Sequence, residues 1–272
     1  MNKSMKIVMI IILLILAILV TSFMIYALIN NKNPFWDFSG QSVLLLDQTY
    51  EKDIKNINIE AVSADIYIKE AEDEQIHVLI YGSEKENAES TIDGESLNIS
   101  KKGKIFCFGF CFQKTEIIVY IPKNKKLNLN IKTISGNVEI SSNQANVEIK
   151  TTSGDIKTEE IKDAKITTTS GDILVTKANK LEVGTTSGSI NVDKIENSIE
   201  AKSVSGDIKI NSFEIKENSH IKTVSGDVLI NEISDVFIET STTSGDVNVS
   251  NNNQKSSQTL TIRTTSGDIR TR

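Results

Sequence analysis

The chain has 272 residues, a formal net charge of −6, two Pro and 14 Gly, and hydrophobic residues make up 39% of it. This composition excludes collagen-like, proline-rich and wholly disordered chains, and the length allows one or two domains. The acidic balance argues against a nucleic-acid partner, and two Cys and two His leave few ligands for a metal, so we expect no cofactor.

An uncharged, apolar segment occupies residues 7–29. As a helix this segment would extend about 34 Å, enough to cross a hydrocarbon core of ~30 Å. Lys3 and Lys6 precede it and favour a cytoplasmic N-terminus. A cleaved signal peptide is the alternative, but its apolar region would be shorter, at ~7–15 residues. The sequence therefore predicts a transmembrane signal-anchor at 1–29, a linker and first strand at 30–54, and an extracytoplasmic remainder in a single-pass protein of the cell membrane.

Alternating apolar residues mark further strands within residues 55–125. They include Ile57 and Ile59, Ile76 to Ile80, Leu97 and Ile99, and Ile117 to Ile121. We expect this region to form degenerate solenoid rungs or a small β cap.

Residues 106–112 alternate four Phe with two Cys around Gly109. A strand would place Phe on one face and Cys on the other, whereas a tight turn at Gly109 would bring Cys107 opposite Cys111. A disulfide between them is reasonable outside the cytoplasm, although such pairs also stay free. The Phe side chains form either a hydrophobic cap or an exposed contact patch for a membrane or partner. This patch would comprise Phe106, Phe108, Phe110 and Phe112.

A repeated Ser-Gly-Asp-Ile tetrapeptide dominates residues 126–272. Its eight copies are separated by 18, 17, 17, 18, 20, 19 and 22 residues. Before each Ser, apolar residues or Thr alternate with polar residues, which is typical of a strand with one buried face. After each Gly the apolar positions change parity, so the chain turns a corner there. The copies begin at Ser135, Ser153, Ser170, Ser187, Ser205, Ser225, Ser244 and Ser266.

One such unit cannot bury its own apolar face, but units stacked ~4.8 Å apart can. The predicted fold is all-β, a parallel β-helix or β-solenoid with one N-terminal transmembrane helix. A β-sandwich is the alternative, but it needs no fixed register between hairpins. Ser63-Ala64-Asp65 continues the frame upstream. Inward Thr and Ser are expected to hydrogen-bond along the stack, and the last copy, with Arg270 and Arg272, is expected to form an open edge.

Together with Tyr120-Ile121-Pro122, these copies resemble the bacterial "putative adhesin" family, a domain of unknown function, over roughly residues 55–272. The resemblance implies a β-solenoid of the cell envelope, associated with surface attachment or envelope-stress responses. It implies no catalytic residues.

Six copies carry Asp directly after the Gly, so their carboxylates form a column on the predicted stack. The structural interpretation is that each Asp hydrogen-bonds the amides of its own turn. The alternative is a ladder of cation sites, since hard cations prefer several oxygen ligands. The column consists of Asp155, Asp172, Asp207, Asp227, Asp246 and Asp268, while Asn137 and Ser189 are exceptions.

No motif of a serine hydrolase, metalloprotease or phosphate-binding loop is present. The leading hypothesis is a non-catalytic, adhesin-like protein that binds an envelope or surface ligand. The alternatives are a regulatory component of an envelope-stress system with a membrane-protein partner and, less favoured, a polysaccharide-active enzyme.

Overall fold

The computed structural model describes residues 21–22, 42–51, 53–83, 87–102, 115–141, 144–250 and 252–272. The strands belong to one compact unit, formed by Ser42–Ile105 and Lys114–Arg272. Most of the predicted membrane segment and residues 103–114, with both Cys and the Phe patch, lie outside the described residues. Among the residues that are described, no helix has the length and apolar character needed to span a membrane.

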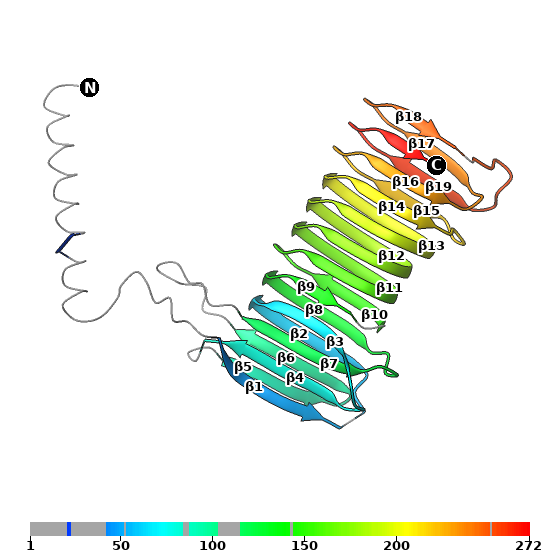
Figure 1. Ribbon diagram of the computed structural model, residues 1–272. Coiled ribbons are helices and arrows are strands. Elements are labelled where there is room, and N and C mark those ends of the chain that lie inside the picture. The colour runs from blue at the N-terminus through cyan, green and yellow to red at the C-terminus, as the bar shows by residue number, and fades with distance from the viewer. Residues whose placement is uncertain are drawn as a thin grey trace, which may run out of the picture. The chain divides into compact units, whose positions relative to one another are not determined.

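The unit is a β-solenoid whose strands stack in two faces, as Figure 1 shows. We call the strands before each Ser-Gly corner the pre-glycine face and those after it the post-glycine face. In stacking order, the pre-glycine face contains β5 (Asn87–Asp93), β6 (Ser96–Lys102), β2 (Asn56–Ser63), β8 (Asn128–Ser135), β10 (Gln144–Lys150), the second halves of β11 (Ile156–Ser170), β12 (Ile173–Ser187) and β13 (Ile190–Ser205), then β15 (Ser219–Lys222), β19 (Thr259–Arg263) and β17 (Phe237–Ser241).

The post-glycine face follows the same axis. It contains β1 (Val43–Tyr50), β4 (Ile76–Gly82), β7 (Glu116–Pro122), β3 (Asp65–Ala71), β9 (Val138–Ile140), the first halves of β11, β12 and β13, then β14 (Ile208–Phe213), β16 (Val228–Ile233), β20 (Ile269–Thr271) and β18 (Val247–Val249). The all-β solenoid predicted from the repeat is confirmed.

Alternation along each strand builds the core between the two faces. In β12, for example, Ile173, Val175, Leu181 and Val183 are buried, while Leu174 and Glu182, which lie between them, are exposed. Ala178 is buried at the corner opposite the glycines. Because all rungs share this pattern, equivalent residues stack in continuous columns, and each thin rung buries its apolar side chains only against its neighbours.

The glycine corner is required by both backbone conformation and space. Gly188 has a φ of +141°, a region that side chains with a Cβ rarely adopt. A Cβ there would lie 2.1 Å from the carbonyl oxygen of Gly171 in the preceding rung. Ala64 replaces Gly in the β2–β3 rung, and Gly136 stacks directly on its carbonyl.

The N-terminal part of the stack does not follow chain order. The β2–β3 rung lies between β6 and β7 on one side and β8 and β9 on the other. The segment after β3 therefore folds back and stacks on the side of the β2–β3 rung that faces away from β8 and β9. β4 pairs antiparallel with both β1 and β7, and β5 pairs antiparallel with β6. This arrangement ends the parallel stack with antiparallel strands.

The last copy of the repeat does not end the stack, because the C-terminal rungs do not stack in chain order. The prediction that this copy forms an open edge is therefore wrong. β19 lies between β15 and β17, and β20 lies between β16 and β18. The rung that ends the stack is therefore β17–β18. Asn252 shields part of β17, since its side chain bonds both the N–H and the carbonyl of Ile238.

The inward Thr column bonds in two ways and only partly along the stack. Thr133, Thr151 and Thr168 donate to the carbonyl two residues ahead in their own turn. Toward the C-terminal end, Thr242 instead donates to the carbonyl of Gly267 in the neighbouring rung. The expected ladder along the stack is therefore confirmed only in part.

Candidate functional site

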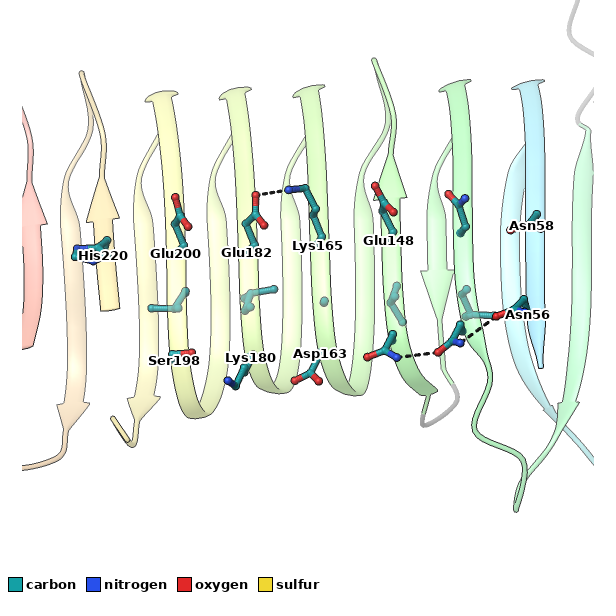
Figure 2. A pocket seen from close by; sticks show the side chains of 18 of the residues that line it. Asn56, Asn58, Glu148, Asp163, Lys165, Lys180, Glu182, Ser198, Glu200 and His220 are labelled. Carbon is teal, nitrogen blue, oxygen red and sulfur yellow. Dashed lines mark hydrogen bonds and ion pairs between the residues drawn. The ribbon is translucent and has the colours of Figure 1, made fainter. Parts of the chain in front are cut away.

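A groove of ≈ 690 Å³ runs along the outer surface of the pre-glycine face. Its walls are the outward side chains of eight successive strands, from β6 to β15. Figure 2 shows these side chains in rows that cross the strands. The polar lining residues are Asn56, Asn58, Ser96, Asn128, Asn130, Asn146, Glu148, Asp163, Lys165, Lys180, Glu182, Ser198, Glu200, Asn218 and His220.

Asparagine side chains dominate the N-terminal half of this groove. In one row, Asn146 donates to Asn128 at 2.8 Å, Asn128 to Asn56 at 3.0 Å, and Asn56 to Ser96 at 3.4 Å. In the neighbouring row Asn58 donates to Asn98 at 2.8 Å. We call these two rows, together with Asn130, the amide rows. They arise because outward positions of equal frame stack directly above one another.

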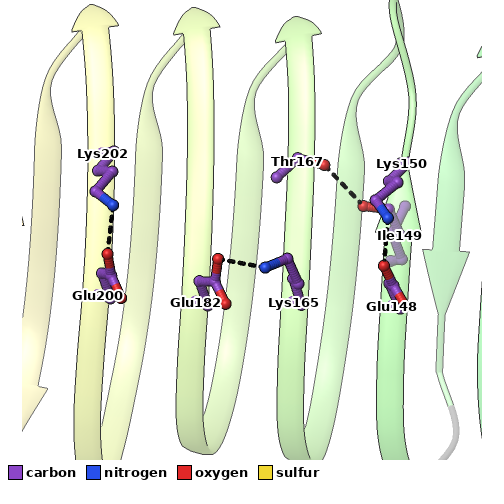
Figure 3. Close-up of polar contacts among 8 residues, drawn as sticks. All are labelled: Glu148, Ile149, Lys150, Lys165, Thr167, Glu182, Glu200 and Lys202. Atoms are coloured by element: carbon purple, nitrogen blue, oxygen red, sulfur yellow. Dashed lines mark hydrogen bonds and ion pairs between the residues drawn. The ribbon is translucent and has the colours of Figure 1, made fainter.

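Ion pairs occupy the C-terminal half of the groove (Figure 3). Lys165 donates to Glu182 at 2.6 Å across two strands, and this bond raises the pKa of the Lys165 ammonium. Lys202 donates to Glu200 within one strand, and that bond holds the pKa of the Glu200 carboxyl below its usual 4.5.

Glu148 is paired in the same way as Glu200. Lys150 donates to it at 2.5 Å and lowers the pKa of the carboxyl. The carboxyls of Glu148 and Glu200 are therefore ionised and engaged at neutral pH, which leaves neither of the two as a protonated general acid.

The predicted Asp column is assembled at the glycine corners. Asp155 Oδ1 accepts the N–H of Asp172 at 2.9 Å, and Asp172 Oδ1 accepts the N–H of Ser189 at 2.7 Å. Asp207, Asp227 and Asp268 repeat this contact further along the stack. The expectation that each Asp bonds its own turn is therefore wrong: the carboxylate accepts from the next rung, because equivalent corners are stacked.

Ser189 interrupts the column. Among the described members of the column that are followed by another rung, only Ser189 has a side chain that accepts no hydrogen bond from an N–H of that rung. A hollow of ≈ 270 Å³ lies beside it, lined in part by Asp207, Asp227, Lys209 and Arg270. A serine side chain is one atom shorter than Asp or Asn, which accounts for the missing contact.

Cation binding by the Asp column stays a prediction. In the described part of the chain, no group of three or more His, Cys, Asp and Glu residues is arranged to hold a metal ion. Asp268 has both oxygens engaged, one with the amide of Asp246 and the other with Arg270 at 2.6 Å. Cys107, Cys111 and the Phe patch lie outside the described residues, so the disulfide and the contact patch stay predictions.

The amide rows are the feature that sequence reasoning missed. The outward positions of the repeat carry Asn at Asn128, Asn130 and Asn146, and the upstream strands carry Asn56 and Asn58 in the same frame. Aligning the outward positions as carefully as the inward ones exposes this signal. The order of the strands, however, is needed to show that β6 and β2 continue the rows.

Two-strand rungs, glycine corners and a polar outer groove define a parallel β-solenoid of the non-globular, repeat class. The sequence matches the model of the Toastrack DUF4097 family over residues 54–272, and the chain belongs to this family. The comparison with curated proteins found no match.

Solved structures with a similar fold include a "putative adhesin" from Bacteroides fragilis. It is 15% identical, the match covers 86% of this chain and 99% of that one, and the TM-score is 0.56. A "putative adhesin" from Parabacteroides distasonis is 14% identical, with 85% and 98% covered and a TM-score of 0.44. A "putative lipid binding protein" from the same species is also 14% identical, with 83% and 96% covered and a TM-score of 0.42.

Proposed function

We propose that this protein is a membrane-anchored, extracytoplasmic binding protein that works without catalysis, in the manner of an adhesin. The observation that carries the proposal is the groove on the pre-glycine face, which is preformed on rigid strands. Sites on strands hold their side chains in place before a ligand arrives, which reduces the ordering cost of binding.

The chemistry of the groove supports binding over turnover. Its glutamates Glu148, Glu182 and Glu200 are each held by a lysine, so they are oriented but not free for acid–base chemistry. The similar structure from Bacteroides fragilis is that of a "putative adhesin", which agrees with this proposal.

The anchor is inferred from residues 7–29, whose length and lack of charge suit a membrane span. With Lys3 and Lys6 inside, the solenoid would lie outside the cytoplasm. The partners we propose are the membrane itself and a ligand of the envelope or of an opposing surface.

The test is made on the full-length protein with a C-terminal epitope tag. We expect the tag in the membrane fraction, resistant to alkaline wash, and degraded by protease added to intact spheroplasts. Cosedimentation with purified envelope fragments should then show saturable binding. Recovery of the tag in the soluble cytoplasm, or no binding to any envelope or surface preparation, would overturn the proposal.

A further inference from the structure

One of the amide rows spans four neighbouring strands, β6, β2, β8 and β10, without a charged side chain among its members. The other spans β6, β2 and β8, and Glu148 follows it on β10. Ser96, Asn56, Asn128 and Asn146 follow one another across these strands with hydrogen bonds of 2.8–3.4 Å. The chain of bonds fixes each amide plane, because every Asn between two partners both donates and accepts. The rows are therefore a rigid array, which side chains on separate loops would not provide.

Each bridging amide keeps hydrogen-bonding capacity for a ligand. An Asn side chain has two N–H groups and two lone pairs, and the ladder uses one of each at Asn56 and Asn128. The remaining donor and acceptor lie side by side, and this combination matches a hydroxyl group, which also donates and accepts. Repetition at about 4.8 Å per strand offers the same combination at regular intervals along the groove.

The charged half of the groove does not favour an ionic ligand. Lys165 is paired with Glu182, and Lys180 is paired with Glu217 at 2.7 Å. Binding a phosphate-rich or carboxylate-rich polymer would require breaking these pairs and facing Glu148 and Glu200. A lipid bilayer is also unsuited to the groove, since the outward side chains that line it are polar.

The groove is long in the direction of the stack. Its lining continues over eight strands, which corresponds to about 34 Å at ~4.8 Å per strand. A ligand that contacts all of it must be extended and repetitive. A peptide strand would gain its affinity from main-chain pairing at a free edge, whereas this surface presents side chains only.

We propose that the amide rows bind an uncharged, linear glycan that runs along the groove. This inference rests on the proposed function and names its ligand class. The hydroxyl groups of successive sugar units would bond to Asn56, Asn58, Asn128 and Asn146. The paired charges of the C-terminal half would contribute further hydrogen bonds without selecting an anion or a cation.

The experiment uses full-length protein in lipid nanodiscs and two uncharged glycans, chitohexaose and laminarihexaose, in isothermal titration calorimetry. Polygalacturonate serves as an anionic comparison. The test variant is Asn58→Ala combined with Asn128→Ala. The matched control is Asn211→Ala, because Asn211 belongs to a similar cross-rung ladder, between Asn231 and Asp193, outside the groove. Asn58→Asp is a shape-conserving second variant, should the double variant fail to fold.

We expect at least one uncharged glycan to bind, with little change between 50 mM and 500 mM NaCl. The double variant should bind about 10-fold more weakly or worse, as expected for two lost hydrogen-bonding side chains, and Asn211→Ala should bind as the parent does. The inference is overturned if neither glycan binds, if the groove variants bind normally, or if only polygalacturonate binds. When glycans fail but envelope fragments still bind, the ligand class is wrong and the proposed function stands; when envelope fragments fail too, both are wrong.

Discussion

At the scale of single residues, the glycine corners are the positions where backbone conformation and available space together require glycine. Gly188 combines a φ of +141° with a carbonyl oxygen 2.1 Å from where a Cβ would lie. Gly184 lies in β12, and a Cβ added there would have no neighbouring atom closer than 3.7 Å. The two glycines therefore have different reasons to be glycine, although the sequence shows them only four residues apart.

Gly188→Ala is expected to destabilise the protein by about 3 kcal/mol, because strain and overlap act together at a backbone contact that cannot shift without moving a rung. Urea unfolding followed by circular dichroism measures this change. Gly184→Ala is the control and should be neutral or stabilising by up to about 1 kcal/mol, since Ala has less freedom in the unfolded chain. Equal effects of the two substitutions would contradict the account.

A single substitution at Ser189 is expected to stabilise the fold. Asn137, in the equivalent position, accepts the N–H of Asp155 at 2.9 Å. Ser189→Asn should supply the same contact to the amide of Asp207 and stabilise the fold by about 1 kcal/mol, without adding charge. The measurement is the urea midpoint, and Ser189→Ala should leave it nearly unchanged. A midpoint for the Asn variant at or below that of the parent would show that the column does not work as described.

At the scale of elements, the strand order departs from the chain order, because β19 and β20 lie between the preceding rung and β17–β18. Ile269 and Val247 occupy the same position of their repeats, three residues after Ser. Ile269 is fully buried in β20, whereas Val247 in β18 is 45% exposed. Chain order alone would assign the buried role to Val247 and the exposed role to Ile269.

Ile269→Asp is therefore expected to destabilise the solenoid by more than about 3 kcal/mol, because it places an unpaired charge in the core. Val247→Asp should cost less than about 1 kcal/mol, since the carboxylate stays in water. Thermal unfolding of both variants under one condition ranks them. The reverse ranking would show that the last copy in the sequence is also the last in the stack.

The outer face of β13 gives a prediction about pH. Lys202 donates to Glu200 and lowers the pKa of its carboxyl below 4.5. Since the folded pKa is the lower one, this pair stabilises the protein above about pH 4.5, and the contribution is lost as the pH falls through the folded pKa. The effect on stability is small because the pair is exposed and screened by salt.

Lys202→Ala should raise the pKa of Glu200 back toward 4.5, as followed by the carboxyl carbon shift in a nuclear magnetic resonance titration. Lys209→Ala, on the opposite face, is the control and should leave the Glu200 titration unchanged. A Glu200 pKa that does not move in Lys202→Ala would rule out the ion pair as its cause.

At the scale of the whole solenoid, each rung contacts only its neighbours, so stability depends on how many neighbours a rung has. β11, β12 and β13 are the longest strands, and β12 is paired over nearly its full length on both sides. β17 and β18 pair along one side with β19 and β20. Unfolding is thus expected to begin at the ends.

Amide hydrogen exchange tests this gradient. Protection should be greatest in β12, and the amides of β18 should exchange at least about 100-fold faster than those of β12. β1, which pairs only with β4 among the described strands, should also exchange early. Equal protection throughout the stack would mean that the solenoid opens as one cooperative unit instead.

The sequence allowed the repeat frame, the buried columns and the glycine corner to be derived, because these depend on local alternation that every copy repeats. Ile173 and Val175 are buried where the pattern places them, and Gly188 turns the chain where the parity changes. The sequence also indicated the Asp column, but it did not show which amide donates to each carboxylate. That partner belongs to the next rung, and only stacking reveals which amide lies within reach of Asp155.

The tertiary structure decided the order of the rungs and therefore the groove. Spacing along the chain shows that rungs are equivalent, but equivalent rungs can stack in more than one order at similar local cost. Long-range pairing placed β6 beside β2 and β20 between β16 and β18. That order brings Ser96, Asn56 and Asn128 into one row, a juxtaposition that no local pattern encodes because the three residues lie on strands far apart in the chain.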